Sequence, residues 1–144
     1  MKVLIINGAN MNLLGKREPD VYGKDTLEDL EKTVRKEADK RGTEVEFFQS
    51  NHEGEIIDAI HRAMEEKVEA IIINPGAFTH YSYAIRDAIK GTGIETIEVH
   101  MSNVHSREEF RTKSVIAPVC KGQISGFGFE SYLAALYLLT KCGL

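Results

Sequence analysis

The sequence has little of what secreted or membrane-spanning proteins depend on. Its 144 residues include only two cysteines, Cys120 and Cys142, too few for the disulfide framework of a small secreted domain. We therefore expect both thiols to be reduced in a cytoplasmic protein. No apolar run approaches the length of a membrane span. The short apolar run after Lys2 turns polar at Asn7, which predicts a first strand and not a signal peptide.

Positive charge and metal-binding motifs are also scarce. Lys and Arg number 18 against 22 Asp and Glu, so the net charge is −4. Nucleic acids and anionic membranes bind basic faces, and we expect neither as a partner. Five His occur, but no HExxH or CxxC spacing supports a metal site.

What is present is the composition of an ordinary globular protein. Hydrophobic residues make up 42% and charged residues 28% of the chain, as in typical compact domains. A chain of this length can bury roughly 68–70% of its unfolded surface. We expect residues 1–144 to form a single domain that needs neither a metal nor a disulfide to fold.

Short apolar runs alternate with amphipathic stretches. The apolar runs, each closed by turn residues, predict strands at 3–6, 45–49, 70–73, 94–99 and 123–126. Helical spacing of apolar residues predicts helices over 27–41, 55–66, 82–90 and 130–141, with a short helix at 107–110. Residues 11–25 are expected to be a long polar loop, and 115–119 a strand or a loop. This alternation is typical of a doubly wound parallel α/β sheet, and five strands fit the flavodoxin-like order 2-1-3-4-5.

Polar side chains follow three of the predicted strands. The groups concerned are Asn10, Arg17 and Tyr22 after the first strand, Asn74, Gly76 and His80 after the third, and His100, Ser102 and Arg111 after the fourth. Ligands of such sheets bind beyond the carboxyl ends of the strands. Because imidazole, amide and guanidinium groups suit a small polar anion, their convergence predicts an active site.

The loop at residues 11–25 is expected to act as a lid, since long loops are often functional. It contains Tyr22, whose free phenol titrates near pH 10. A nearby guanidinium, from Arg17 or Arg107, would favour the phenolate and make it a base. Taken alone, Tyr22 would more often be a packing or surface residue, and His100 could equally be a structural histidine.

A second class of function stays open on these patterns: a flavodoxin-like module that binds FMN or a phosphate. A loop that cradles a phosphate should be rich in Ser, Thr and Gly, whereas the loop after the first strand offers Asn and Leu. Gly126-Phe127-Gly128-Phe129-Glu130-Ser131 resembles GxGxxG but lacks its last glycine.

Five segments together resemble the type II 3-dehydroquinate dehydratases. They are Asn7-Gly8-Ala9-Asn10-Met11-Asn12-Leu13-Leu14-Gly15-Lys16-Arg17-Glu18-Pro19-Asp20-Val21-Tyr22-Gly23, Gln49-Ser50-Asn51-His52-Glu53-Gly54, Asn74-Pro75-Gly76-Ala77-Phe78-Thr79-His80, Ala84-Ile85-Arg86-Asp87-Ala88 and Glu98-Val99-His100-Met101-Ser102-Asn103-Val104-His105. The resemblance runs from near residue 5 to near residue 140. Ala9 departs from the usual proline, and Ser131 stands where some members have glycine; neither change removes a reacting group.

The resemblance implies dehydration of 3-dehydroquinate to 3-dehydroshikimate in the shikimate pathway, by anti elimination through an enolate and without a cofactor. Tyr22 would be the base, activated by Arg17, and His100 the acid, oriented by Glu98. Asn10 would hold a water that stabilises the enolate. The implied substrate-binding residues are Asn74, His80, Met101, Ser102 and Arg111, together with Asp87 from a neighbouring subunit. The family forms dodecamers built as tetramers of trimers.

Overall fold

The chain folds around a parallel sheet of five strands, β1 (Lys2–Asn7), β2 (Glu44–Gln49), β3 (Ala70–Asn74), β4 (Glu95–His100) and β5 (Gly122–Ser125). In this computed structural model the backbone is described for residues 1–142, and the side chains for all of these except Val21, Tyr22 and Cys142. The strand order is β2-β1-β3-β4-β5. The predicted fold class and strand order are therefore confirmed.

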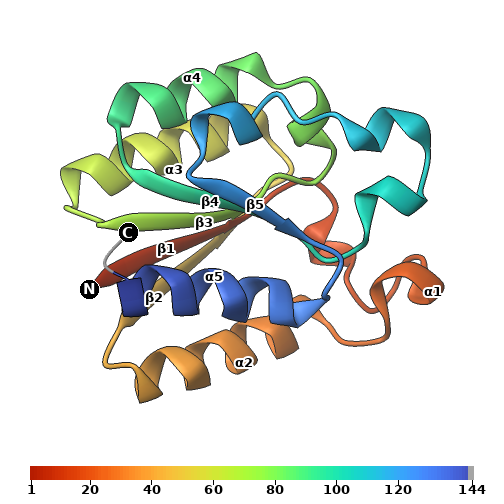
Figure 1. Cartoon of the computed structure of the whole chain (residues 1–144), viewed down its shortest axis with the longest axis horizontal. Helices are drawn as coiled ribbons and strands as arrows, with labels where there is room; N and C mark the ends of the chain where they lie inside the picture. Colours follow the sequence, from red (N-terminus) through yellow and green to blue (C-terminus); the bar gives the residue numbers. More distant parts are fainter. Residues whose placement is uncertain (143–144) are drawn as a thin grey trace.

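Helices cover both faces of the sheet (Figure 1). On one face α2 (Leu27–Lys40) and α5 (Phe129–Cys142) bury Leu30, Val34 and Leu136 against the strands. On the other face α3 (Glu53–Glu65) and α4 (Tyr83–Thr92) form a second core. Neighbouring strand residues such as Ile5 and Ile6 enter opposite cores. The central strands are continuously apolar because both of their faces are covered.

The helix ends follow local sequence signals. The Thr26 side chain accepts the Asp29 backbone N–H, and the Asp29 carboxylate accepts the Thr26 N–H. This capping box satisfies two backbone donors at the start of α2. Ser82 caps α4 in the same way by accepting the Ile85 N–H.

Residues 11–25 differ from the prediction of a loop without structure of its own. They contain a 3₁₀ turn, Met11–Leu13, and a one-turn helix, α1 (Pro19–Tyr22). Pro19 occupies the first helical position, where its missing N–H costs no hydrogen bond. Residues 115–119 likewise form no strand but end in a 3₁₀ turn, Ala117–Val119, and the short helix expected at 107–110 is a 3₁₀ turn at Glu109–Thr112.

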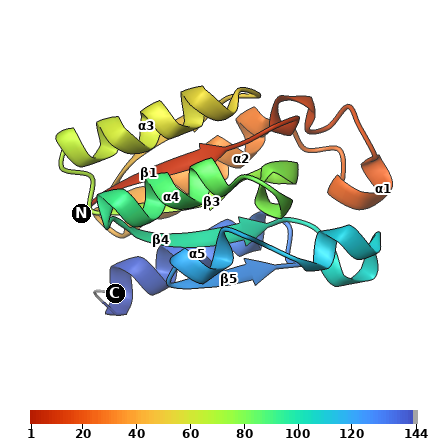
Figure 2. The same cartoon turned by 90° about the horizontal axis from the view of Figure 1, so that it is seen from above.

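Two segments extend past the carboxyl ends of the strands: α1, and the chain between β4 and β5 (Figures 1 and 2). Both follow strands in the middle of the sheet, β1 and β4, with β3 between them. In the part of the chain that the structure describes, no helix is long and apolar enough to span a membrane.

Candidate active site

A pocket of about 690 Å³, its open mouth included, lies at the carboxyl ends of β1, β3 and β4. Its walls come from the three segments that follow these strands, and they comprise Ala9, Asn10, Met11, Leu14, Arg17, Asn74, Gly76, Ala77, His80, His100, Met101, Ser102, Val104, Arg107 and Arg111. The strand order brings these segments together, because β3 lies between β1 and β4.

The turns after β1 and β3 pack backbone against backbone at the base of the pocket. The Gly8 N–H donates to the Asn74 carbonyl at 2.8 Å, and a Cβ added at Gly8 would lie only 2.3 Å from the Pro75 oxygen. Gly76 has a φ of +63°, and a Cβ there would lie 2.8 Å from the Ala9 oxygen. Only glycine permits this approach, which sets the spacing between Asn10 and Asn74.

His100 is held from behind by a fully buried carboxylate. The side chains at positions 98 and 100 point to the same face of β4, and His100 Nε2 lies 2.5 Å from Glu98 Oε2. Oε2 also accepts hydrogen bonds from Thr79 Oγ1 at 2.7 Å and Gln123 Nε2 at 2.8 Å, while Oε1 accepts one from Ser114 Oγ at 2.8 Å. A carboxylate only accepts, so Nε2 carries a hydrogen and the second ring nitrogen, Nδ1, is left for a ligand.

Opposing effects act on the Glu98 carboxyl. Burial raises its pKa, but the hydrogen bonds from His100, Thr79 and Ser114, together with the charge of His100, hold the pKa below its ordinary value. Glu98 is therefore an anion at neutral pH.

This pair predicts a pH-dependent contribution to stability. Because the folded-state pKa of Glu98 lies below its unfolded value, the contribution is fully present above about pH 4.3 and is lost as the pH falls through the folded-state pKa. We expect Glu98→Gln to lower the free energy of unfolding by about 1.5–3 kcal/mol at pH 7, as for hydrogen bonds to a charged group. Denaturant titrations between pH 7 and pH 3 should show the difference from wild type shrinking below about pH 4. A difference in the free energy of unfolding between wild type and Glu98→Gln that stays constant with pH would contradict this account.

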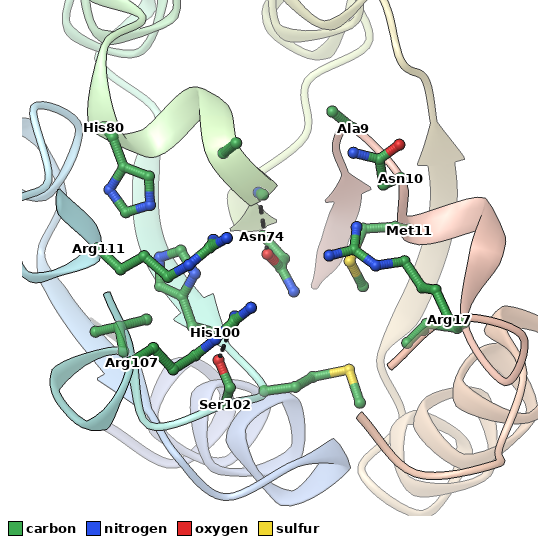
Figure 3. Close-up of a pocket in the computed structure, with 15 residues that line it drawn as sticks. Ala9, Asn10, Met11, Arg17, Asn74, His80, His100, Ser102, Arg107 and Arg111 are labelled. Carbon is green, nitrogen blue, oxygen red and sulfur yellow. Dashed lines mark hydrogen bonds between the residues drawn. The ribbon is translucent and has the colours of Figure 1, made fainter. Parts of the chain in front are cut away.

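Three guanidinium groups face the pocket, Arg17 from one wall and Arg107 and Arg111 from the other (Figure 3). Arg107 Nη1 donates to Ser102 Oγ at 3.2 Å, and Arg107 has only 11% of its side chain exposed. Guanidinium groups that converge in this way form a site for an anion, particularly a carboxylate.

Two carboxylates form ion pairs with arginines of the pocket. Arg17 Nη2 lies 2.5 Å from Glu18 Oε2, and Arg111 Nε donates to Glu108 Oε1 at 3.0 Å. The hydrogen bond from Arg17 lowers the pKa of Glu18, and the one from Arg111 lowers the pKa of Glu108. Both carboxylates are exposed, so a bound anion can compete with them for the same guanidinium groups.

Most of the site residues suggested by the sequence meet in this pocket. Eight of them line it: Asn10, Arg17, Asn74, His80, His100, Met101, Ser102 and Arg111. Glu98 lies behind His100. Asp87 is exposed on α4 and is not among the lining residues. Tyr22 ends α1, but its side chain lies outside the described part of the structure.

Other contributors to the site carry no motif. Arg107 was expected only as a possible neighbour of Tyr22, whereas the structure shows it in the pocket wall. The donors that surround Glu98 come from three separate segments and were missed. Of these donors, only Gln123 could have been found by pairing the predicted strands, since it lies directly opposite Glu98 in the β4–β5 register. Cys120 is no nucleophile candidate, because burial, with the charge of Glu98, raises the pKa of its thiol to about 12.

The fold and the pocket define a class: a doubly wound α/β protein that presents an imidazole–carboxylate pair and three arginines to a small anion at its sheet edge. Within that class, the chain belongs to the dehydroquinase class II family, which matches residues 1–140. It is 69% identical to a 3-dehydroquinate dehydratase of Caldicellulosiruptor bescii, with 97% of each chain covered. A 3-dehydroquinate dehydratase of Bacillus licheniformis is 61% identical over 93% of this chain and 92% of its own.

Solved structures agree with the sequence relatives. The crystal structure of type II dehydroquinase from Butyrivibrio crossotus superimposes with a TM-score of 0.95 at 51% identity, covering 96% of this chain and 97% of that one. That from Propionibacterium acnes gives 0.93 at 38% identity, covering 97% and 96%.

Proposed function

We propose that this chain dehydrates 3-dehydroquinate to 3-dehydroshikimate, a step of the shikimate pathway toward chorismate and the aromatic amino acids. Family membership over residues 1–140 supports this activity. The observation that carries it in the structure is the buried Glu98–His100 pair at the wall of a pocket with three arginines. Such a pocket suits a substrate with a carboxylate to bind and a hydroxyl to expel.

The elimination divides between two groups. Tyr22, as phenolate, removes the C2 proton next to the ketone, and the electron pair moves onto the carbonyl oxygen to give an enolate. A water held by Asn10 stabilises that enolate, an electrostatic role. As the enolate collapses, the C1–O bond breaks and His100 gives its proton to the departing hydroxyl, so that water leaves. Glu98 keeps the imidazole oriented through its contact with Nε2.

Substrate binding is proposed for Asn74, His80, Met101, Ser102 and Arg111, all of which line the pocket. The backbone N–H groups of Met101 and Ser102 would bind the carboxylate, and Arg111 the ring hydroxyls. Arg17 would lower the pKa of Tyr22 by favouring the phenolate. No organic cofactor or metal is part of this scheme.

We also propose assembly into a dodecamer, a tetramer of trimers, in the cytoplasm, with Asp87 completing the site of a neighbouring subunit. Asp87 lies on the exposed side of α4. Large aromatic side chains are exposed near it in sequence, Tyr81 and Tyr83 at 58% each. Exposed apolar groups of this size often mark a protein interface.

The direct test is ultraviolet absorbance of the purified, assembled protein with 3-dehydroquinate and a chelator. A rising band from the conjugated enone product is expected. Treatment with substrate and borohydride should leave activity intact, because no imine forms. A flat trace would refute the dehydratase activity and favour a flavodoxin-like module that binds FMN or a phosphate. Inactivation by borohydride would refute the enolate route.

A further inference from the structure

A buried chain of hydrogen bonds lies behind the pocket wall at Asn74. The Tyr132 side chain, in α5, is fully buried, and its hydroxyl lies 2.5 Å from Asn7 Oδ1 and 2.9 Å from Asn74 Nδ2. Asn7 and Asn74 are neighbours in the parallel register of β1 and β3. Of the three residues only Asn74 lines the pocket, so Asn7 and Tyr132 can influence a ligand only through it.

The direction of each hydrogen bond follows from one backbone donor. The Gly76 N–H can only donate, and it lies 3.2 Å from Asn74 Oδ1 (Figure 3), so that atom is the amide oxygen. The other amide atom, Nδ2, then donates to the Tyr132 oxygen. The single hydroxyl proton of Tyr132 is left for Asn7 Oδ1. Burial raises the pKa of Tyr132, so the hydroxyl keeps this proton at any working pH.

We propose that Tyr132 is a positioning residue that makes Asn74 present an N–H donor to the substrate. Nδ2 has two hydrogens, and Tyr132 accepts one of them. The second has no partner among the described residues, although Asn74 is almost fully buried and lines the pocket. An oxygen of the substrate carboxylate or of a ring hydroxyl is the acceptor that fits. This inference rests on the proposed function, because it assigns a role toward 3-dehydroquinate.

Removal of the Tyr132 hydroxyl should weaken substrate binding more than the chemical step. The Asn74 amide would lose the shorter of the two contacts that hold its orientation, leaving only the Gly76 N–H at 3.2 Å, and could turn its oxygen toward the anion. We expect Tyr132→Phe to raise KM about tenfold, the factor that corresponds to about 1.4 kcal/mol. Because Asn74 holds substrate and does not transfer the proton, kcat should stay within about threefold of wild type.

Tyr137→Phe is the matched control, since it removes a hydroxyl from the same helix. Tyr137 is exposed, and its hydroxyl contacts Lys141 away from the pocket. The control should have wild-type KM and kcat, and the melting temperature of each variant reports its folding. A Tyr132→Phe protein with a lower melting temperature but wild-type KM would show a purely structural role and overturn the proposal. An inactive wild type would instead refute the proposed function, and this role with it.

Asn7→Ala provides a second route that keeps the Tyr132 side chain. It removes the acceptor of the Tyr132 proton, so the hydroxyl can turn this proton toward Asn74, where only the amide oxygen can accept it. KM should rise as in Tyr132→Phe. The double variant should be no worse than the worse single variant, because both changes act through Asn74. Effects on KM that multiply in the double variant would overturn the proposal. If Tyr132→Phe is too unstable to assay, a wild-type KM in Asn7→Ala would overturn it instead.

Discussion

Tyr22→Phe is expected to fold and assemble like the wild type and to lose at least about 10²–10⁴-fold in kcat, the usual contribution of one positioned base. The change removes only the phenol oxygen that would accept the C2 proton. The backbone of Tyr22 ends α1, directly before Gly23 with its φ of +79°. This one-turn helix begins two residues after Arg17, which lines the pocket. Steady-state absorbance assays measure the loss, and wild-type turnover would refute the base assignment.

The pH profile tests how that base is activated. A free phenol titrates near pH 10, and an adjacent guanidinium lowers that pKa because it favours the phenolate. We expect Arg17→Ala to move the alkaline rise of kcat to higher pH, because the phenolate would lose its stabilising positive charge. Lys16→Ala is the control, because Lys16 is exposed next to Arg17 but does not line the pocket. A profile that shifts equally in both variants, or in neither, would remove Arg17 as the activator.

His100→Ala is expected to lower kcat about 10²–10⁴-fold, the usual range for a lost general acid, and to slow loss of the hydroxyl more than removal of the proton. The reason lies in the pair geometry: Glu98 Oε2 holds Nε2 at 2.5 Å, so the second ring nitrogen can serve the leaving hydroxyl. Tyr22 and Arg17 are untouched, so the enolate can still form and return.

Two rates measured on one sample separate these steps. Deuterium exchange at C2, followed by nuclear magnetic resonance, reports proton removal, and absorbance reports product. In His100→Ala the ratio of exchange to product should rise well above that of wild type. His61→Ala, a change at an exposed position of α3, should leave both rates unchanged. Equal losses in exchange and product formation would contradict the acid assignment.

Local sequence patterns predicted the architecture because each acts over a few residues. Continuous apolar runs identified the strands, and the helical spacing of apolar residues identified α2, which buries Leu30, Val34 and Ala38. The order of elements then required the segments after β1, β3 and β4 to meet. The spacing of Glu98 and His100 put both side chains on one face of β4, where they are in contact.

The sequence by itself thus determined the fold class, the edge of the sheet that holds the pocket and most of its lining. Only the tertiary structure decided what lies behind that lining. Tyr132 meets Asn74 across 58 positions of sequence, and the donors to Glu98 come from 16 to 25 positions away. Such contacts depend on the rotation of α5 against the sheet and on the conformation of the loops. The periodicity of apolar residues determines which face of an element is buried, but it does not determine which atoms come into contact.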